Sequence, residues 1–128
     1  MTERTLISSG TATEREFGYS RAVRAGGFVS VAGTTAMTAD GPVGGTDVAE
    51  QTRECLRRIQ AALEQAGAGL PDVVRTRIFV VDIDTWREVG RVHREVFAET
   101  LPATRIVEVA RLFDPRLLVE IEADAIAE

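Results

Sequence analysis

The apolar residues of this chain recur at helical spacing in two stretches. The first stretch begins after Thr46 and Asp47, either of which can cap a helix, and it ends before Gly67, a suitable C-terminal residue. The second begins at Asp84, another capping residue, and Pro102 stops it. The apolar stripe of the first predicted helix comprises Val48, Cys55, Leu56, Ile59, Ala62, Leu63 and Ala66, and that of the second comprises Trp86, Val89, Val92, Val96 and Phe97.

Runs of β-prone residues flank the two helices and predict six strands. Gly26 and Gly27 permit positive φ and predict a tight hairpin between the second and third strands. The polar segment 9–16 and the glycine-rich segment 38–45 are interpreted as loops. The predicted strands lie at residues 5–8, 19–24, 28–33 and 73–83 and in the segments 102–112 and 118–123.

The order of elements is therefore β-β-β-α-β-α-β-β, within one domain of residues 1–128. Two amphipathic helices need a sheet to cover, which predicts a two-layer α+β sandwich with both helices on one face of a mixed sheet. The other face then lacks a cover, and burial against further copies in closed symmetry predicts an oligomer. Its apolar residues, on one parity or the other, are Val29, Val31, Val107 and Val109.

The composition is that of an acidic protein with enough apolar residues for one core, since the net charge is −5 and 45% of residues are hydrophobic. This charge argues against a broad phosphate-binding surface, so nucleic acid is not an expected partner. A single cysteine, Cys55, allows no intrachain disulfide, and we recognise neither a signal sequence nor a membrane-spanning run. We therefore expect a cytoplasmic protein that does not enter a membrane.

Charged and apolar residues alternate in the last quarter of the chain. An arginine at the start of one strand, Arg105, and a carboxylate in the next, Glu120, can together bind an anion and move a proton. These roles depend on register, because a shift by one residue turns a strand side chain to the opposite face. In a regular last strand, one face holds Glu120, Glu122 and Asp124 and the other holds Val119, Ile121 and Ala123.

Several segments resemble the sequence signatures of the YjgF/RidA (Rid) family. They follow one another in the family's order and span nearly the whole chain. The N-terminal signature is matched by Gly18-Tyr19-Ser20-Arg21-Ala22-Val23 and by Gly27-Phe28-Val29-Ser30-Val31-Ala32-Gly33. The further matching segments are 63–68, 72–76, 102–103, 107–112 and 120–123.

This resemblance implies a chorismate-mutase-like α+β fold that forms a homotrimer with three clefts at the subunit interfaces. It also implies hydrolysis of reactive enamines and imines, of the 2-aminoacrylate type, to a keto acid and ammonia, without a metal or another cofactor. In the family's deaminase branch, an arginine directly after Pro-Ala binds the substrate carboxylate, and a carboxylate helps to position the attacking water. The expected ligand is therefore a small carboxylate.

The deaminase site is matched incompletely. Thr104 stands at the arginine position and Arg105 follows one residue later; Ala32 replaces a serine, and Gly90 replaces an asparagine. By resemblance, the retained residues Glu120 and Tyr19 are the catalytic candidates. The substrate-binding candidates are Gly33, Thr104, Arg105 and His93.

Each candidate residue also has a structural interpretation. Arg105 is either a carboxylate ligand, re-aimed by a bulge near Pro102, or a solvent-facing arginine. Glu120 is either a solvated acid or a partly buried base with a raised pKa. Tyr19 either orients a ligand or packs at a subunit contact. His93 has no Cys or His partner at metal spacing, which argues against a metal site.

Two classes of function remain open from these residues. The first is a cofactor-independent enamine/imine deaminase. The second is a non-catalytic trimer that binds a small metabolite or another protein through the same clefts, which the residues Ala32, Gly90 and Thr104 favour. A ribonuclease, reported among relatives, is disfavoured by the acidic charge.

Overall fold

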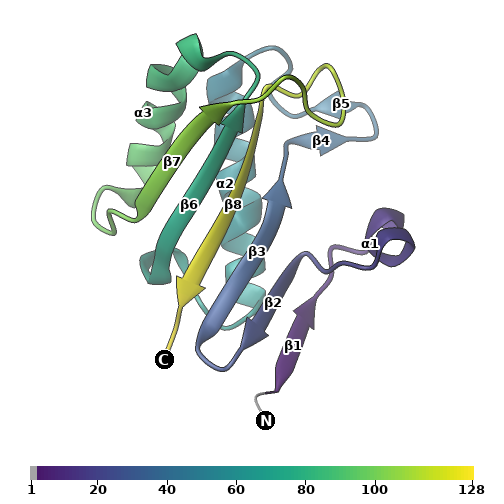
Figure 1. Ribbon diagram of the computed structural model, residues 1–128, viewed down its shortest axis with the longest axis vertical. Coiled ribbons are helices and arrows are strands. Elements are labelled where there is room, and N and C mark those ends of the chain that lie inside the picture. Colours follow the sequence, from purple (N-terminus) through teal and green to yellow (C-terminus); the bar gives the residue numbers. More distant parts are fainter. Residues whose placement is uncertain (1–2) are drawn as a thin grey trace.

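Six strands form one mixed sheet in the computed structural model of the protein, which describes residues 3–128. In Figure 1, helices α2 and α3 lie behind this sheet on the same side. The neighbours β6 and β7 run parallel and α3 connects them, whereas the other neighbouring pairs run antiparallel. This arrangement confirms the predicted two-layer α+β sandwich with a mixed sheet. In sheet order, the strands are β1 (Arg4–Ile7), β2 (Ala22–Ala25), β3 (Phe28–Thr34), β8 (Val119–Ile126), β6 (Val73–Val80) and β7 (Ala103–Glu108).

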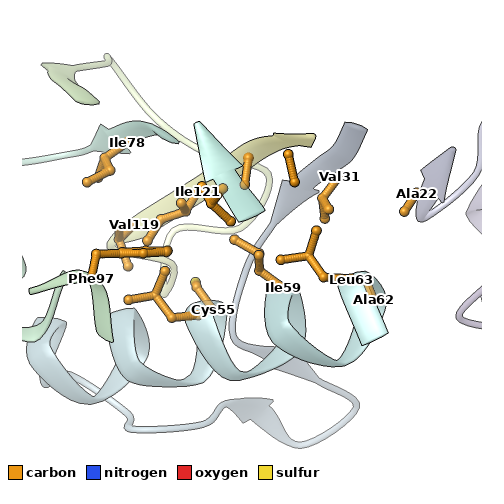
Figure 2. Close-up of a cluster of buried hydrophobic side chains, with 14 of the residues drawn as sticks. Ala22, Val31, Cys55, Ile59, Ala62, Leu63, Ile78, Phe97, Val119 and Ile121 are labelled. Carbon is orange, nitrogen blue, oxygen red and sulfur yellow. The ribbon is translucent and has the colours of Figure 1, made fainter. Parts of the chain in front are cut away.

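Helix α2 (Val48–Gln65) forms where the apolar stripe predicts it. The Asp47 side chain accepts hydrogen bonds from the backbone N–H groups of Ala49 and Glu50, which caps the helix. Just beyond its end, Gly67 has a φ of 78°, a conformation that favours glycine. Figure 2 shows side chains of α2, among them Ile59 and Leu63, pointing toward the sheet. Each such fully buried aliphatic side chain stabilises the fold by roughly 1.5–3 kcal/mol.

Helix α3 (Trp86–Phe97) buries Val89, Val92 and Phe97 against the same core. The prediction for Trp86 is wrong, because this side chain lies at the exposed first position of the helix, where the Arg87 guanidinium stacks 4.4 Å from its ring centroid. Asp84 does not cap α3 either. The helix follows a short 3₁₀ turn, η2 (Ile83–Thr85), and Asp82 caps that turn by accepting from the Asp84 N–H.

Both predicted loops contain short elements. Helix α1 (Ala12–Phe17) overlaps the first of these segments and ends one residue beyond it, and the short strands β4 (Met37–Thr38) and β5 (Gly41–Pro42) pair at the start of the second. The helix has no apolar stripe to reveal it. Instead, the Glu14 carboxylate accepts hydrogen bonds from Ser8, Ser9 and Thr11, which hold the segment in place.

The two faces of the sheet differ in chemistry, and β8 alternates as predicted. Its odd-numbered residues from Val119 to Ala125 are buried under the helices, whereas Glu120, Glu122 and Asp124 lie on the open face. On that face, Arg77 Nη1 lies 3.0 Å from Asp124 and 3.4 Å from Glu122.

The expectation that apolar valines line the open face is wrong for Val29 and Val31. Both are buried beneath α2, because β3 presents its odd-numbered residues to the helices. The open face nevertheless carries exposed apolar side chains on Leu6, Phe28 and Ile126. Among the described residues, no helix has both the length and the apolar character needed to cross a membrane.

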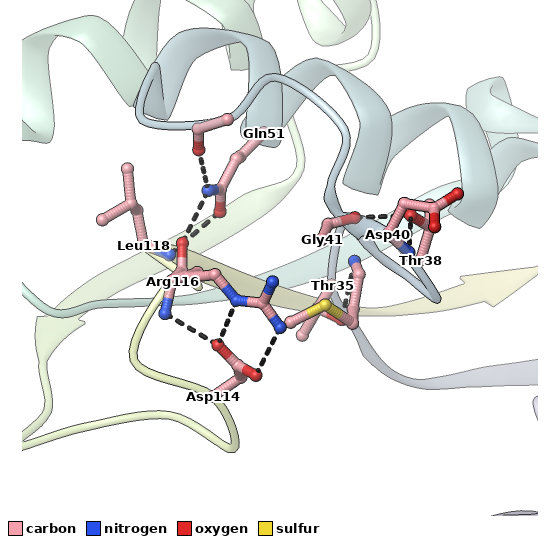
Figure 3. A network of polar contacts seen from close by, with 10 residues as sticks. Thr35, Thr38, Asp40, Gly41, Gln51, Asp114, Arg116 and Leu118 are labelled. Carbon is pink, nitrogen blue, oxygen red and sulfur yellow. Dashed lines mark hydrogen bonds and ion pairs between the residues drawn. The ribbon is translucent and has the colours of Figure 1, made fainter.

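A buried amide anchors the segment that leads into β8. Gln51 of α2 is fully buried, and its Nε2 donates to the Gly45 and Arg116 carbonyl oxygens at 2.7 and 2.9 Å. Its Oε1 accepts from the Leu118 N–H at 2.9 Å. Figure 3 shows Gln51 reaching from the helix to this segment, beside the Asp114–Arg116 pair. The start of β8, and with it the position of Glu120, is thereby tied to α2.

Candidate functional site

A β-bulge in β3 creates the closest approach in the candidate site. Val31 pairs with Ala123, but Thr34 rather than residue 33 pairs with Ile121, so β3 holds one extra residue. The bulge brings the backbone of Gly33 against the side chain of Glu120. A Cβ atom at position 33 would overlap the Glu120 Oε2 atom, so any larger residue here would force this flexible carboxylate to move.

Glu120 projects from β8 beside this bulge and is half-buried. Burial raises the pKa of its carboxyl group, the neighbouring Glu122 raises it further, and Arg21 opposes the change. A carboxyl group with a raised pKa can accept and return a proton closer to neutral pH than an ordinary glutamate can. Both the retained position and the environment therefore suit a general base.

Arg21 lies at the same bulge and was not among the predicted site residues. Its Nη2 donates to the Gly33 carbonyl oxygen at 2.8 Å, and its own carbonyl accepts from the Ala32 N–H at 3.0 Å. The Nε atom is buried and has no hydrogen-bond partner among residues 3–128. No local sequence pattern links position 21 to a bulge twelve residues later, which explains the omission.

Tyr19 follows α1 and lines a cavity together with Arg21. The residues Tyr19, Arg21, Gly33 and Glu120 are called here the Glu120 cluster. The Tyr19 ring is partly exposed, and its hydroxyl lies 3.1 Å from Thr13 Oγ1. Its backbone N–H donates to the Glu14 carbonyl at 3.0 Å. The same short helix that the sequence analysis missed therefore positions Tyr19.

A second polar cluster lies under the other end of the sheet. Thr76 Oγ1 is 2.9 Å from His93 Nε2 and 2.8 Å from Thr104 Oγ1, and Thr104 Oγ1 is 3.1 Å from the Pro102 carbonyl oxygen. We call His93, Thr76 and Thr104 the Thr–His chain. Thr104 is exposed and, together with Gly90 and His93, it lines a cavity of about 260 Å³.

Burial lowers the pKa of His93, which favours its neutral imidazole form within the Thr–His chain. The centroids of the His93 and Phe97 rings lie 4.6 Å apart, which contributes to that burial. Thr76 was not among the predicted site residues. Its importance comes from the parallel register of β6 and β7, which places it directly opposite Thr104.

Arg105 lies on the opposite face of the sheet from the Thr–His chain. It pairs in register with Arg77, whereas Thr104 pairs with the buried Thr76. The register of β7 is continuous from Ala103 to Glu108, so no bulge re-aims the side chain. Within one copy, Arg105 therefore does not substitute for an arginine at position 104.

The Glu120 cluster and Thr104 also lie on opposite faces of the sheet, so one copy does not unite all predicted site residues. Among the described residues, no three His, Cys, Asp or Glu side chains converge as metal ligands. The single cysteine offers no nucleophile, because burial raises the pKa of the Cys55 thiol to about 12.

Comparison with known proteins covers nearly all of the chain. A family model described as endoribonuclease L-PSP matches residues 9–127. An uncharacterized protein of Streptomyces coelicolor is 38% identical over 119 residues, which cover 93% of this chain and 89% of the relative. The 2-iminobutanoate/2-iminopropanoate deaminase of Escherichia coli is 40% identical over 84 residues, or 62% of this chain and 64% of that enzyme.

A solved structure agrees with the fold as well as with the sequence. The crystal structure of a Mycobacterium tuberculosis member of the YjgF/YER057c/UK114 family superposes with a TM-score of 0.90 at 57% identity. The match covers 98% of this chain and 100% of the mycobacterial chain.

Proposed function

The chain belongs to the endoribonuclease L-PSP family, which includes the YjgF/RidA proteins, and from this membership we propose that it hydrolyses small reactive imines and enamines. The observation that carries the proposal is the contact of the bulged Gly33 backbone with the half-buried Glu120 carboxylate. The products are a keto acid and ammonia, and the reaction needs neither a metal nor a cofactor. The net charge of −5 argues against RNA as the substrate, despite the family's name.

In this proposal, Glu120 acts as the base toward a water molecule held beside the Gly33 backbone. The carboxylate takes a proton from water as the water oxygen bonds to the carbon of the protonated imine, and the C=N electron pair moves to the nitrogen, which becomes an amine. Glu120 then gives this proton to the amine nitrogen. The carbon–nitrogen bond breaks as Glu120 takes the proton of the new hydroxyl group, so ammonia departs and a carbonyl group remains. Tyr19 lines the site and orients the ligand through its hydroxyl group.

The complete site in this proposal lies between copies of the chain in a homotrimer. Tyr19, Gly33 and Glu120 come from one copy, and Thr104 and His93 come from its neighbour. The support is that these two sets occupy opposite faces of the sheet within one copy. Arg105 lies on the open face of the sheet, so its proposed role is to contact a ligand that binds on that face.

Release of ammonia from 2-aminoacrylate generated in situ tests the proposal. We expect the protein at micromolar concentration to accelerate this release, and we expect Glu120→Gln to abolish the acceleration. If the wild-type protein leaves the rate unchanged, the deaminase proposal fails.

A non-catalytic, metabolite-binding trimer is the second candidate. It is favoured by the Thr–His chain, which presents a neutral hydroxyl group where the deaminase branch has an arginine. Ligand screening by thermal shift distinguishes the two functions. A binding protein gains stability in a saturable way without turnover, whereas a deaminase consumes the ligand.

A further inference from the structure

A cavity of about 720 Å³ lies beside the Glu120 cluster, between the N-terminal segment and α2. Tyr19 and Arg21 form part of its wall, so it adjoins the bulge at Gly33. Two arginines of α2, Arg57 and Arg58, line it from the other side. Three guanidinium groups thus border one cavity in a chain whose net charge is −5.

Hydrogen bonds hold these guanidinium groups in place before any ligand binds. Arg58 donates from Nε to Glu54 at 2.7 Å and from Nη1 to the Thr35 and Met37 carbonyl oxygens at 2.8 and 2.9 Å. Arg57 Nε donates to Glu54 at 2.8 Å. Because Arg58 is already oriented, binding an anion there costs little further side-chain entropy, whereas the exposed Arg57 is oriented by Glu54 alone.

The acids nearby do not cancel this positive charge. Arg57 and Arg58 hold the pKa of Glu54 below its usual value, so it balances one arginine. The Glu14 carboxylate is also ionised, but it is directed to the hydroxyl groups of the N-terminal segment. Among the residues that line the cavity, three arginines face one acid, Glu14; Glu54 pairs with two of these arginines from outside the lining, and Glu120 lies near the third.

Donor capacity also remains at the cavity. Arg57 and Arg58 each use two of their three nitrogen atoms, and Arg21 uses one, in hydrogen bonds to residues 3–128. The buried Nε of Arg21 is among the atoms without a partner. Planar guanidinium groups with open N–H positions match the geometry of a carboxylate.

We propose that this cavity is an anion-binding site in which Arg21, Arg57 and Arg58 hold the carboxylate group of a small organic acid. The choice of a 2-oxo or 2-imino acid rests on the proposed function. The site offers guanidinium groups within the copy that carries Glu120, although neither Gly33 nor Glu120 lines the cavity and Arg21 alone links the two sites. Arg21, which bonds the Gly33 carbonyl oxygen, connects the bound anion to the Glu120 cluster.

Calorimetric titration with 2-oxobutanoate, at constant ionic strength, tests this site without turnover. We expect saturable binding that Arg57→Gln weakens at least tenfold. Arg21→Gln should weaken it to a similar extent, but that change also removes a bond to the bulge. The exposed Arg57 therefore provides the decisive variant.

Arg53→Gln is the matched control. Arg53 also lies on α2 and is also exposed, but it pairs with Glu50 and Glu95 and does not line the cavity. Equal losses in Arg53→Gln and Arg57→Gln would overturn the proposal, as would equally tight binding of the uncharged analogue 2-butanone. Tighter binding of inorganic phosphate than of 2-oxobutanoate would overturn the assignment to carboxylates.

The outcome is separable from that of the proposed function. Binding that depends on Arg57, in a protein that releases no ammonia, supports the anion site and contradicts the deaminase. Ammonia release that is unchanged in Arg57→Gln, together with unchanged binding, supports the deaminase and contradicts the anion site.

Discussion

Gly33 and Glu120 approach each other so closely across β3 and β8 that a single methyl group at position 33 would overlap the carboxylate. The bulge at residues 32–33 creates this contact by adding one residue to β3. It places backbone polar groups directly beside a half-buried acid.

Gly33→Ala should displace the Glu120 side chain. We expect activity to fall by about a hundredfold, because a shift of about 1 Å in a catalytic group has that effect. The free energy of unfolding should fall by less than about 1 kcal/mol, because a Cβ would meet only the end of a flexible, half-buried side chain. Gly69→Ala is the control, since a Cβ there would make only an ordinary 3.5 Å contact with Pro71 and the backbone φ of −159° accepts any residue. Equal effects of the two substitutions on the ammonia-release rate would contradict the assigned role of the contact.

Glu120→Gln should lower activity and yet raise stability at neutral pH. Burial raises the pKa of Glu120 in the folded state, so the stability it contributes is fully present below the unfolded pKa of 4.5. That stability is lost as the pH rises through the folded pKa. Urea unfolding of both proteins at pH 4 and pH 7 checks the sign. The stability advantage of the variant should appear at pH 7 and shrink at pH 4.

Glu14→Gln should loosen the N-terminal segment and Tyr19 with it. Burial alone would raise the pKa of Glu14, but hydrogen bonds from Ser9, Ser8 and Thr11 outweigh it and lower the pKa to about 2. The ionised acid thus contributes stability above pH 4.5, which is lost as the pH falls toward 2. We expect the variant to cost about 1–3 kcal/mol at pH 7.

The exposed Glu16 provides the control for that experiment. Glu16→Gln should change the unfolding free energy by less than about 0.5 kcal/mol. A cost for Glu14→Gln that is the same at pH 2 and pH 7 would show that shape, rather than charge, explains the effect.

Thr76→Val should break the Thr–His chain while conserving volume. The Thr104 hydroxyl donates to the Pro102 carbonyl oxygen, so the Thr76 hydroxyl must donate to Thr104. The contact between Thr76 and His93 then has a proton only if His93 carries its hydrogen on Nε2. Nitrogen NMR of the wild-type protein should therefore detect the Nε2–H tautomer. The substitution should cost about 1–3 kcal/mol by leaving buried groups unsatisfied. Thr46→Val, at an exposed position, should be nearly neutral, and an Nδ1–H tautomer would contradict the chain.

Much of the architecture could be predicted from local patterns. The stripe from Val48 to Ala66 specified α2, because a period of 3.6 residues places those side chains on one face. Alternation likewise placed Glu120 and Val119 on opposite faces of β8. Helix α1 escaped prediction because contacts from Ser8 and Ser9, rather than an apolar stripe, stabilise it.

The faces of the sheet on which the residues of β3 and β7 lie could not be predicted, because they depend on pairing with other strands. The period of two residues left open which face of β3 meets the helices, and pairing with β8 buried Val29 and Val31. Pairing with β6 likewise placed Thr104 under the sheet and Arg105 on the open face. The family's motif had already marked position 104 as altered, but it could not show what Thr104 contacts.

The sequence by itself determined the two-layer fold and Glu120 as an acid on an alternating strand, because both follow from spacing along the chain, and the resemblance of its motifs indicated the family. The tertiary structure alone revealed that Gly33 touches Glu120, that Arg21 bonds the bulge and that Thr76 joins His93 to Thr104. Those contacts join residues 12 to 87 positions apart. They depend on the register of paired strands and on one inserted residue, which the pattern within a single strand does not specify.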